Sequence, residues 1–204
     1  MNETGKTPEA VLRAARQLFA RRGYEGTSIR AITALARANL GAVTYHFGTK
    51  ERLYESVLED VTQPLLARLR GAAAGSSSPL DGIEAVIRAV LEHRHRNPDW
   101  PSLMLHELAL DRRLPDPVRR TMQEVFEILS GLVRLGQKDG SIVAGDPMLL
   151  TLSIISQPLY FALVQRRLQD AFGLDVESTA TRERIADHIV YAVRRSLATS
   201  GRSS

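Results

Sequence analysis

Apolar residues recur at helical intervals along nearly the whole chain, and this regularity constrains the fold more than any other feature. In the first such segment, the apolar positions Val11, Leu12, Ala15, Leu18 and Phe19 are spaced so that they share one face of an α-helix. The 204 residues contain no sustained alternation of apolar and polar side chains, the pattern of a half-buried strand. The sequence therefore predicts an all-α protein of about nine helices.

Capping residues and prolines define four helices in the first part of the chain. We expect a helix capped by Thr7 and followed by Gly23, a helix over about 29–36 capped by Thr27 or Ser28, a helix over about 40–47 after Asn39, and a fourth capped by Thr49. Pro64 is expected to end or kink the fourth helix because proline removes a backbone donor. The low-complexity stretch 71–79 is expected to be a loop.

Five further helices are expected in the rest of the chain, where prolines and glycines mark their limits. They cover about residues 80–96, 101–113, 117–139, 147–172 and 181–198, and the tail 199–204 is expected to be disordered. In the last helix, Ile185, Ile189, Ala192 and Val193 form an apolar stripe. The stripe fits either a four-helix bundle with a second copy of the chain or the core of one copy.

The net charge of +4 is unevenly distributed along the chain. Residues 1–50 hold eight Lys and Arg against three Asp and Glu, whereas residues 51–204 hold 19 against 20. A basic segment beside a neutral remainder is typical of a protein that binds a polyanion, although a solvated basic surface gives the same count. We therefore expect a domain boundary near residue 50, between a basic domain, 1–50, and a neutral remainder, 51–204.

Two short helices joined by a tight turn, within residues 27–47, have the layout of a helix-turn-helix. The second helix carries the small residues Gly41, Ala42 and Thr44, which would let it enter the major groove closely, and Thr44 can contact a thymine methyl group. Tyr45 and His46 can bond phosphates, which orients a protein without reading sequence. A generic helical pair in an all-α core is the alternative.

Residues 8–58 resemble the N-terminal DNA-binding region of TetR-type transcriptional regulators. The resemblance rests on Ala14-Ala15, Leu18-Phe19, Arg22-Gly23-Tyr24, Thr27-Ser28-Ile29-Arg30, Ile32, Ala36, Tyr45-His46-Phe47, Lys50 and Leu53. It implies a homodimer that grips a palindromic operator, with residues 1–50 as the DNA-binding domain and residues 51–204 as a helical domain for effector (inducer) binding and dimerisation. The DNA-binding residues that we predict, most of them by matching position, are Thr27, Ser28, Arg30, Arg37, Asn39, Leu40, Gly41, Ala42, Thr44, Tyr45, His46 and Lys50.

Two positions depart from the pattern of that family. Arg37 stands in the turn where the family usually has glycine, so either the turn tolerates another residue or Arg37 adds a phosphate contact. Thr44 stands where the family often has tyrosine, which would alter base preference.

The C-terminal domain offers candidates for an effector pocket. Pro158 lies inside a predicted helix, and a kink there could line a cavity with neighbouring polar and aromatic side chains. Packing in the core or at a dimer interface is the alternative explanation for these residues. Because Leu, Phe and Tyr are expected to line the cavity, we expect an effector that is at least partly apolar. The predicted ligand-binding residues are Trp100, Met104, His106, Glu107, Phe126, Gln157, Tyr160 and Phe161.

Signals for other functions are weak in this sequence. Cysteine is absent, and His106-Glu107 lacks the second histidine of a zinc-protease motif because residue 110 is leucine. We therefore expect no enzyme, no metal and no cofactor. The polar N-terminus lacks a signal-peptide core and no unbroken apolar run is long enough for a membrane span, so we expect a cytoplasmic protein. The alternatives are an all-α enzyme or metal-binding protein with an incidental basic N-terminus, and a DNA-binding protein without an inducer.

Overall fold

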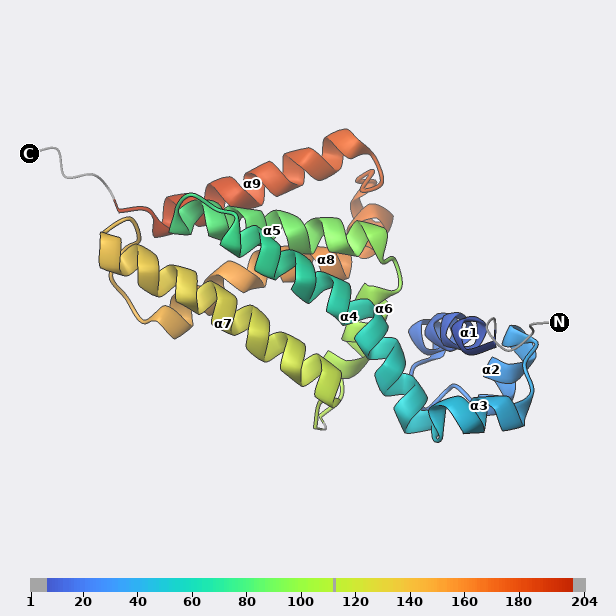
Figure 1. Ribbon diagram of the computed structural model, residues 1–204. Coiled ribbons are helices and arrows are strands. Elements are labelled where there is room, and N and C mark those ends of the chain that lie inside the picture. The colour runs from blue at the N-terminus through green and yellow to red at the C-terminus, as the bar shows by residue number, and fades with distance from the viewer. Residues whose placement is uncertain (1–6, 112, 200–204) are drawn as a thin grey trace, which may run out of the picture. The chain divides into compact units, whose positions relative to one another are not determined.

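The computed structural model describes residues 7–111 and 113–199, and within them it is built from α-helices (Figure 1). The described residues form nine helices and no sheet, so the all-α prediction is confirmed. An isolated β-bridge joins Ile142 to Ala198. The helices are α1 (Thr7–Arg22), α2 (Ile29–Ala36), α3 (Leu40–Phe47), α4 (Lys50–Ala74), α5 (Pro79–Arg96), α6 (Trp100–Leu108), α7 (Asp116–Asp139), α8 (Pro147–Phe172) and α9 (Thr179–Leu197).

Two helix limits differ from those expected from the sequence. Helix α4 does not end at Pro64 but continues to Ala74. Its last turn takes in the alanines at 72–74, which have the highest helix propensity, so the expected loop over 71–79 shortens to residues 75–78. Helix α6 ends at Leu108, five residues earlier than expected, and Leu108 and Leu110 are exposed, so no packing extends the helix. The predicted disorder after Thr199 falls on residues 200–204, which lie outside the described residues.

The described chain divides into two compact units, one formed by residues up to 63 and 97–120 and the other by 64–96 and from 121 onward. In the first unit, α1 packs against α2, α3 and α6. Its core includes Phe19, Ile32, Leu53 and Leu103, each fully buried. The predicted functional domains, 1–50 and 51–204, describe roles and stay a prediction.

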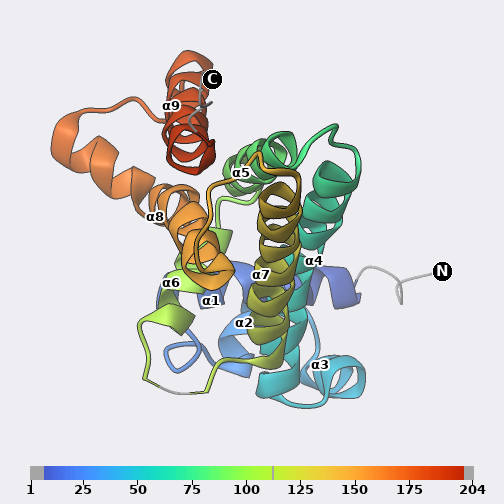
Figure 2. The ribbon, with the colours of Figure 1, turned by 90° about the vertical axis from the view of Figure 1, so that its left-hand side faces the viewer.

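In the second unit, α5 lies against both α8 and α9 (Figure 2). Gly82 on α5 is buried, and a Cβ there would lie 2.9 Å from a terminal methyl group of Leu132 on α7, so a larger residue would require the Leu132 side chain to shift. In the predicted apolar stripe of α9, Ile189 and Val193 are buried within the single chain. Of the two alternatives for the stripe, these two residues therefore belong to the core of one copy of the chain.

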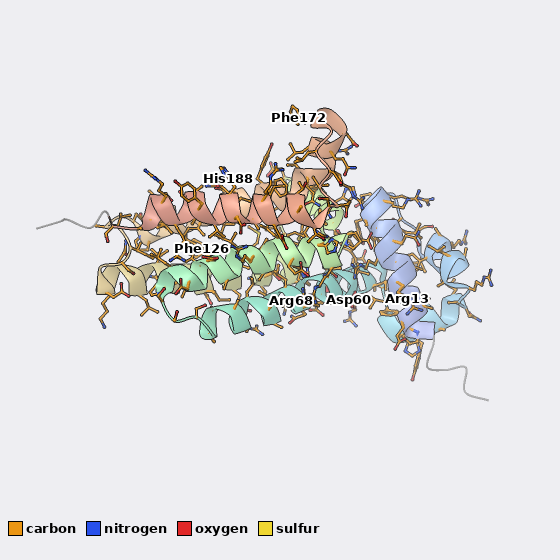
Figure 3. All side chains as sticks on the ribbon, turned by 90° about the horizontal axis from the view of Figure 1, so that it is seen from above. Arg13, Asp60, Arg68, Phe126, Phe172 and His188 are labelled. Carbon is orange, nitrogen blue, oxygen red and sulfur yellow. The ribbon has the colours of Figure 1, made fainter. Side chains whose placement is uncertain are left out.

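Helix α8 presents a large apolar surface to solvent. It is long and apolar enough to cross a membrane by length and composition alone, and 22% of the relevant window is buried. Leu149, Leu152 and Tyr160 are exposed at spacings that place them on one side of the helix. Phe172, at the end of α8, points away from the neighbouring helices (Figure 3) and is 79% exposed. An exposed apolar stripe of this size is typical of an interaction surface.

Candidate nucleic-acid interface and effector cavity

Local hydrogen bonds fix both short helices of the helix-turn-helix. The Ser28 hydroxyl accepts from the Ala31 N–H at 3.2 Å and caps α2, which resolves the choice between Thr27 and Ser28. The Asn39 side-chain oxygen accepts from the Gly41 N–H at 2.7 Å and caps α3. Each cap satisfies a backbone donor that the first helical turn leaves unpaired. The two helices are thus defined by their own sequence as well as by packing.

The turn between α2 and α3 contains Arg37 in the left-handed conformation, with φ 52° and ψ 41°. It is the sole non-glycine residue with positive φ in the described parts of the chain. The Ala38 N–H donates to the Thr33 carbonyl at 3.0 Å, which closes the end of α2. A left-handed residue other than glycine costs about 1–2 kcal/mol. The turn therefore forms with arginine at a cost in stability, and the Arg37 side chain is exposed.

Helix α3 buries one narrow side and exposes the rest. Val43 is buried at 3%, whereas Tyr45 is 85% exposed and Leu40 50% exposed. The Thr44 hydroxyl donates to the Leu40 carbonyl at 3.1 Å, which fixes its rotamer on the exposed face. The exposed side chains of this short helix are accessible to an external partner. The outer face of α3, defined here as Leu40, Gly41, Thr44, Tyr45 and His46, is exposed throughout.

Lys50 opens α4 next to this face and is held by an aromatic ring. Its ammonium nitrogen lies 4.1 Å from the centre of the Tyr24 ring, within range of a cation–π interaction. The Tyr24 hydroxyl donates to Glu51, and this hydrogen bond lowers the pKa of the Glu51 carboxyl. Positive side-chain charge and the N-terminus of a long helix coincide here, an arrangement that suits a phosphate group.

The remaining predicted DNA contacts differ in exposure. Ser28 and Arg30 are exposed at the start of α2, and Asn39 is exposed before α3. Ala42 is half-buried on α3. Thr27 is 2% exposed and its hydroxyl donates to the Gly23 carbonyl at 2.9 Å, so its side chain supports the fold from inside. Eleven of the twelve predicted contacts therefore lie wholly or partly at the surface of one unit.

Half of the predicted effector residues lie on α6 and pack within the first unit. Trp100 and Met104 are buried, and Glu107 is 1% exposed. The Tyr54 hydroxyl donates to Glu107 at 2.6 Å. The His106 ring lies against Gly23, with its Nε2 3.3 Å from the Ala20 carbonyl oxygen. These residues join α6 to α1 and α4, and a role in ligand binding stays a prediction.

The other predicted effector residues lie in the second unit. Phe126 is half-buried on α7, whereas Gln157 and Tyr160 are exposed on α8. Phe161 lines a cavity of about 240 Å³ between α5, α8 and α9. The structure thus brings one of the eight predicted residues to this cavity. Its lining comprises Arg88, Leu91, Glu92, Arg94, His95, Phe161, Gln165, Thr179, Arg182, Glu183, Ile185 and Ala186.

Sequence reasoning missed the buried polar residues of this cavity, although the pattern contained a signal for them. On α5 the buried positions Ile83, Val86 and Val90 are spaced by three and four residues, and Arg94 continues the series. On α8 the buried Pro158 and Ala162 are followed at the same spacing by Gln165. A polar side chain that follows buried apolar residues at helical spacing lies on the same buried face of the helix. It therefore needs a hydrogen-bond partner inside the protein.

Two family models match the chain with this fold. The model for bacterial regulatory proteins of the tetR family matches residues 11–57, and the model for a tetracyclin repressor-like C-terminal domain matches residues 79–193. The chain belongs to the TetR family. The resemblance seen in the N-terminal motif is therefore confirmed and extends over most of the chain.

Named relatives of this TetR-family chain are transcriptional regulators. It is 25% identical over 142 residues to the HTH-type transcriptional repressor NicS of Pseudomonas putida, covering 68% of this chain and 66% of NicS, slightly under two thirds of that protein. It is 30% identical over 155 residues to the HTH-type transcriptional regulator RutR of Escherichia coli, covering 76% of this chain and 73% of RutR. The crystal structure of AibR in complex with isovaleryl coenzyme A and operator DNA has the same fold, with a TM-score of 0.72 at 20% identity over 90% of this chain and 96% of that one.

Proposed function

We propose that this TetR-family protein is a ligand-responsive transcriptional repressor that leaves a palindromic operator when a small molecule binds. The observation that carries the proposal is the exposed outer face of α3 within a capped helix-turn-helix. Thr44 and Gly41 would meet base edges in the major groove. Tyr45, His46 and Lys50 would bond phosphates, with Arg30 and Arg37 adding charge on either side.

The protein acts as a homodimer in this proposal, with α8 as the main contact. The exposed stripe of Leu149, Leu152 and Tyr160 supports this assignment, because a second copy would remove it from water. Two-fold symmetry would set the α3 helices about 34–36 Å apart, one turn of DNA. The apolar composition of α8 then serves protein association and not membrane insertion.

A small-molecule effector controls the dimer by favouring one of its conformers. AibR, which has the same fold, was crystallised with isovaleryl coenzyme A and operator DNA, which supports an effector for this chain too. An effector shifts the equilibrium only as far as it binds one conformer better than the other. The protein has no catalytic step in this account, and it works in the cytoplasm, where bacterial DNA lies.

Selection of bound duplexes from a random DNA pool tests the proposal. We expect an enriched inverted repeat with two half-sites about 10 base pairs apart, bound by two protomers. The variant Leu152→Arg is expected to be monomeric by sedimentation and to lose at least about a hundredfold in operator affinity, because the half-sites then bind independently. Gln17→Arg, an exposed change on α1, is the control. A pool without any enriched sequence would reject the proposal.

A further inference from the structure

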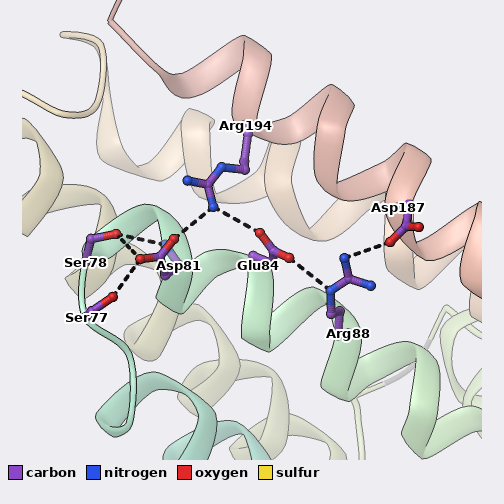
Figure 4. A network of polar contacts seen from close by, with 7 residues as sticks. All are labelled: Ser77, Ser78, Asp81, Glu84, Arg88, Asp187 and Arg194. Atoms are coloured by element: carbon purple, nitrogen blue, oxygen red, sulfur yellow. Dashed lines mark hydrogen bonds and ion pairs between the residues drawn. The ribbon is translucent and has the colours of Figure 1, made fainter.

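Helices α5 and α9 hold two sets of arginines in contrasting surroundings. In the first set, each guanidinium meets carboxylates (Figure 4). Arg194 Nη1 lies 2.9 Å from Asp81 and 3.0 Å from Glu84, and Arg88 Nη2 lies 2.8 Å from Asp187. The hydrogen bond that Arg194 donates to Asp81 raises the pKa of Arg194, and the one that Arg88 donates to Asp187 raises the pKa of Arg88. These two arginines are neutralised within the protein.

Arg94, in the second set, is buried and meets a neutral partner instead. It is 3% exposed, and the Gln165 amide, oriented with its oxygen toward the guanidinium, accepts from Arg94 Nε at 2.8 Å and from both terminal nitrogens at 2.7 and 2.9 Å. The nearest carboxylate, from the exposed Glu177, is 3.7 Å away. Burial is the main cause that lowers the pKa of Arg94; the Glu177 carboxylate opposes it, and the charges of Arg166 and Arg182 lower the pKa further. A buried charge whose counterion is exposed and lies beyond hydrogen-bond distance is only partly compensated, which is costly.

Arg182 lies on the lining of the same cavity and also has neutral partners. Its Nη1 lies 2.7 Å from His95 Nε2, and its Nη2 donates to the Thr179 hydroxyl at 3.0 Å. A guanidinium nitrogen can only donate, so the histidine nitrogen must accept and supplies no negative charge. Arg94 and Arg182 therefore bring two positive charges to one cavity without a carboxylate at hydrogen-bond distance in the contacts of the described residues.

The two carboxylates that line the cavity, Glu92 and Glu183, form no ion pair with Arg94 or Arg182 among the contacts of the described residues. Arg182 nevertheless lowers the pKa of Glu92, and Glu92 therefore offsets part of the charge. Glu92 accepts from Arg96 Nε at 2.7 Å, which engages it outside the cavity lining. Glu183 is exposed on α9. Leu91, Phe161 and Ile185 supply apolar walls beside the arginines. The cavity thus offers two forked cationic donors against a small apolar surface.

The geometry points to an anion-binding site in which Arg94 and Arg182 hold the carboxylate or phosphate group of a small effector between α5, α8 and α9. This inference rests on the proposed function in taking the cavity as the effector site. Arginine forks bind both groups through paired hydrogen bonds. The volume of about 240 Å³ lies below the roughly 300–1,000 Å³ typical of drug-sized ligands. A short acid, or the acidic end of a longer molecule, fits that space.

Titration of the full-length protein with butyrate, inorganic phosphate and butyramide tests the inference, with the Arg94 side-chain Nε–Hε signal in NMR as the readout. We expect butyrate or phosphate to shift this signal in a saturable way, and the stronger of the two identifies the anionic group. Butyramide, a neutral molecule of similar shape to butyrate, should leave the signal unchanged. Equal effects of butyrate and butyramide, or no shift with either anion at tens of millimolar, would overturn the inference.

Two variants change affinity in opposite directions without altering the buried arginine. Arg182→Gln should weaken anion binding about tenfold, the scale of one charge-assisted hydrogen bond. Glu177→Gln removes the carboxylate that competes with the ligand for Arg94 and should strengthen binding about threefold. Arg184→Gln, an equal charge change on the exposed side of α9, should have little effect. Equal affinities in all three variants would contradict the assignment.

The readout separates this inference from the proposed function. The NMR titration needs no DNA, and operator selection needs no anion. Specific operator binding without anion binding would reject the cavity assignment alone. Anion binding without a preferred DNA sequence would reject the repressor and leave the anion site standing.

Discussion

Arg30 and Arg37 on the helix-turn-helix are exposed, whereas Arg94 in the α5–α8–α9 cavity is 3% exposed. Water solvates the first two, so they cost little to maintain and attract any polyanion in a manner that salt screens. Arg94 has lost most of its hydration and has only a neutral amide at hydrogen-bond distance, so an anion stabilises it only by fitting into the cavity. In our proposals the two regions therefore bind different anions, the phosphate backbone of DNA and a single small molecule.

Salt should affect the two regions very differently, and this is the largest effect that we expect. Raising sodium chloride from about 50 to about 200 mM should weaken operator binding about a thousandfold, if a dimer neutralises about six phosphates through Arg30, Arg37 and Lys50. Anion binding in the cavity should change by less than about threefold, because buried pairs are screened far less. Equal salt dependence in fluorescence anisotropy and in the NMR titration would remove the distinction between the regions.

Gly41→Ala tests whether α3 approaches DNA closely. A Cβ at this position would lie 3.4 Å from Asn39, an ordinary contact, so stability measured by chemical unfolding should be equal or slightly higher. Operator affinity should fall about tenfold, the scale of one lost base contact, because the added methyl group would hold the helix away from the groove. In Gly71→Ala on α4, where an added Cβ meets nothing within 4 Å, affinity should not change. An unchanged affinity in Gly41→Ala would place the close approach elsewhere.

Arg37→Gly separates the conformational cost of the turn from its charge. Because glycine adopts positive φ freely, the free energy of unfolding should rise by about 1 kcal/mol. If Arg37 contacts a phosphate, operator affinity should fall severalfold and the log–log salt slope should shrink by about two, one per protomer. Unfolding by urea and anisotropy at several salt concentrations measure the two effects. A more stable variant with an unchanged slope would mean that Arg37 serves no DNA contact.

The smallest expected effect concerns Asp81, the carboxylate that accepts a hydrogen bond from Arg194. Hydrogen bonds from Ser78, Arg194 and Ser77 lower the pKa of Asp81 to about 2 from 3.8. Because the folded pKa is depressed, the stabilising contribution is present above pH 3.8 and is lost as pH falls toward 2. Asp81→Asn should therefore lower stability modestly at pH 5, and the difference from the parent protein should narrow across that window. Urea unfolding at stepped pH measures it, and a difference independent of pH would contradict the role of the carboxylate.

The helix-turn-helix could be predicted because its determinants are local. The side chains of Ser28 and Asn39 each accept a hydrogen bond from a backbone N–H within three residues. A short stretch of sequence is therefore enough to predict where each helix begins. The apolar positions of α3 indicate its buried side only in part, because Val43 is buried and Phe47 half-buried but the equally apolar Leu40 is 50% exposed. The positive φ of Arg37 could not be predicted from arginine itself, because only the surrounding turn imposes it.

The effector cavity could not be predicted in the same way, because its residues come together from distant segments. Arg94, Gln165 and Arg182 belong to three helices, and no local pattern states that these helices are neighbours. Trp100, Met104 and Glu107, which we predicted to bind the effector, are buried on α6, where the Tyr54 hydroxyl donates to Glu107, and their role in ligand binding stays a prediction. The helical spacing of α5 predicts that Arg94 is buried. It does not predict that Gln165 is its partner, because that depends on how the helices pack.

Fluorescence anisotropy with DNA from upstream of the protein's own gene tests the central claim most directly. The control is a shuffled duplex of the same length, at about 150 mM salt, where non-specific binding is weak. The account predicts a preference of about a thousandfold or more for the upstream duplex, with two protomers bound to each site. Equal weak binding to the upstream duplex, the shuffled duplex and every duplex selected from a random pool would mean that the basic face of the helix-turn-helix is only a solvated surface.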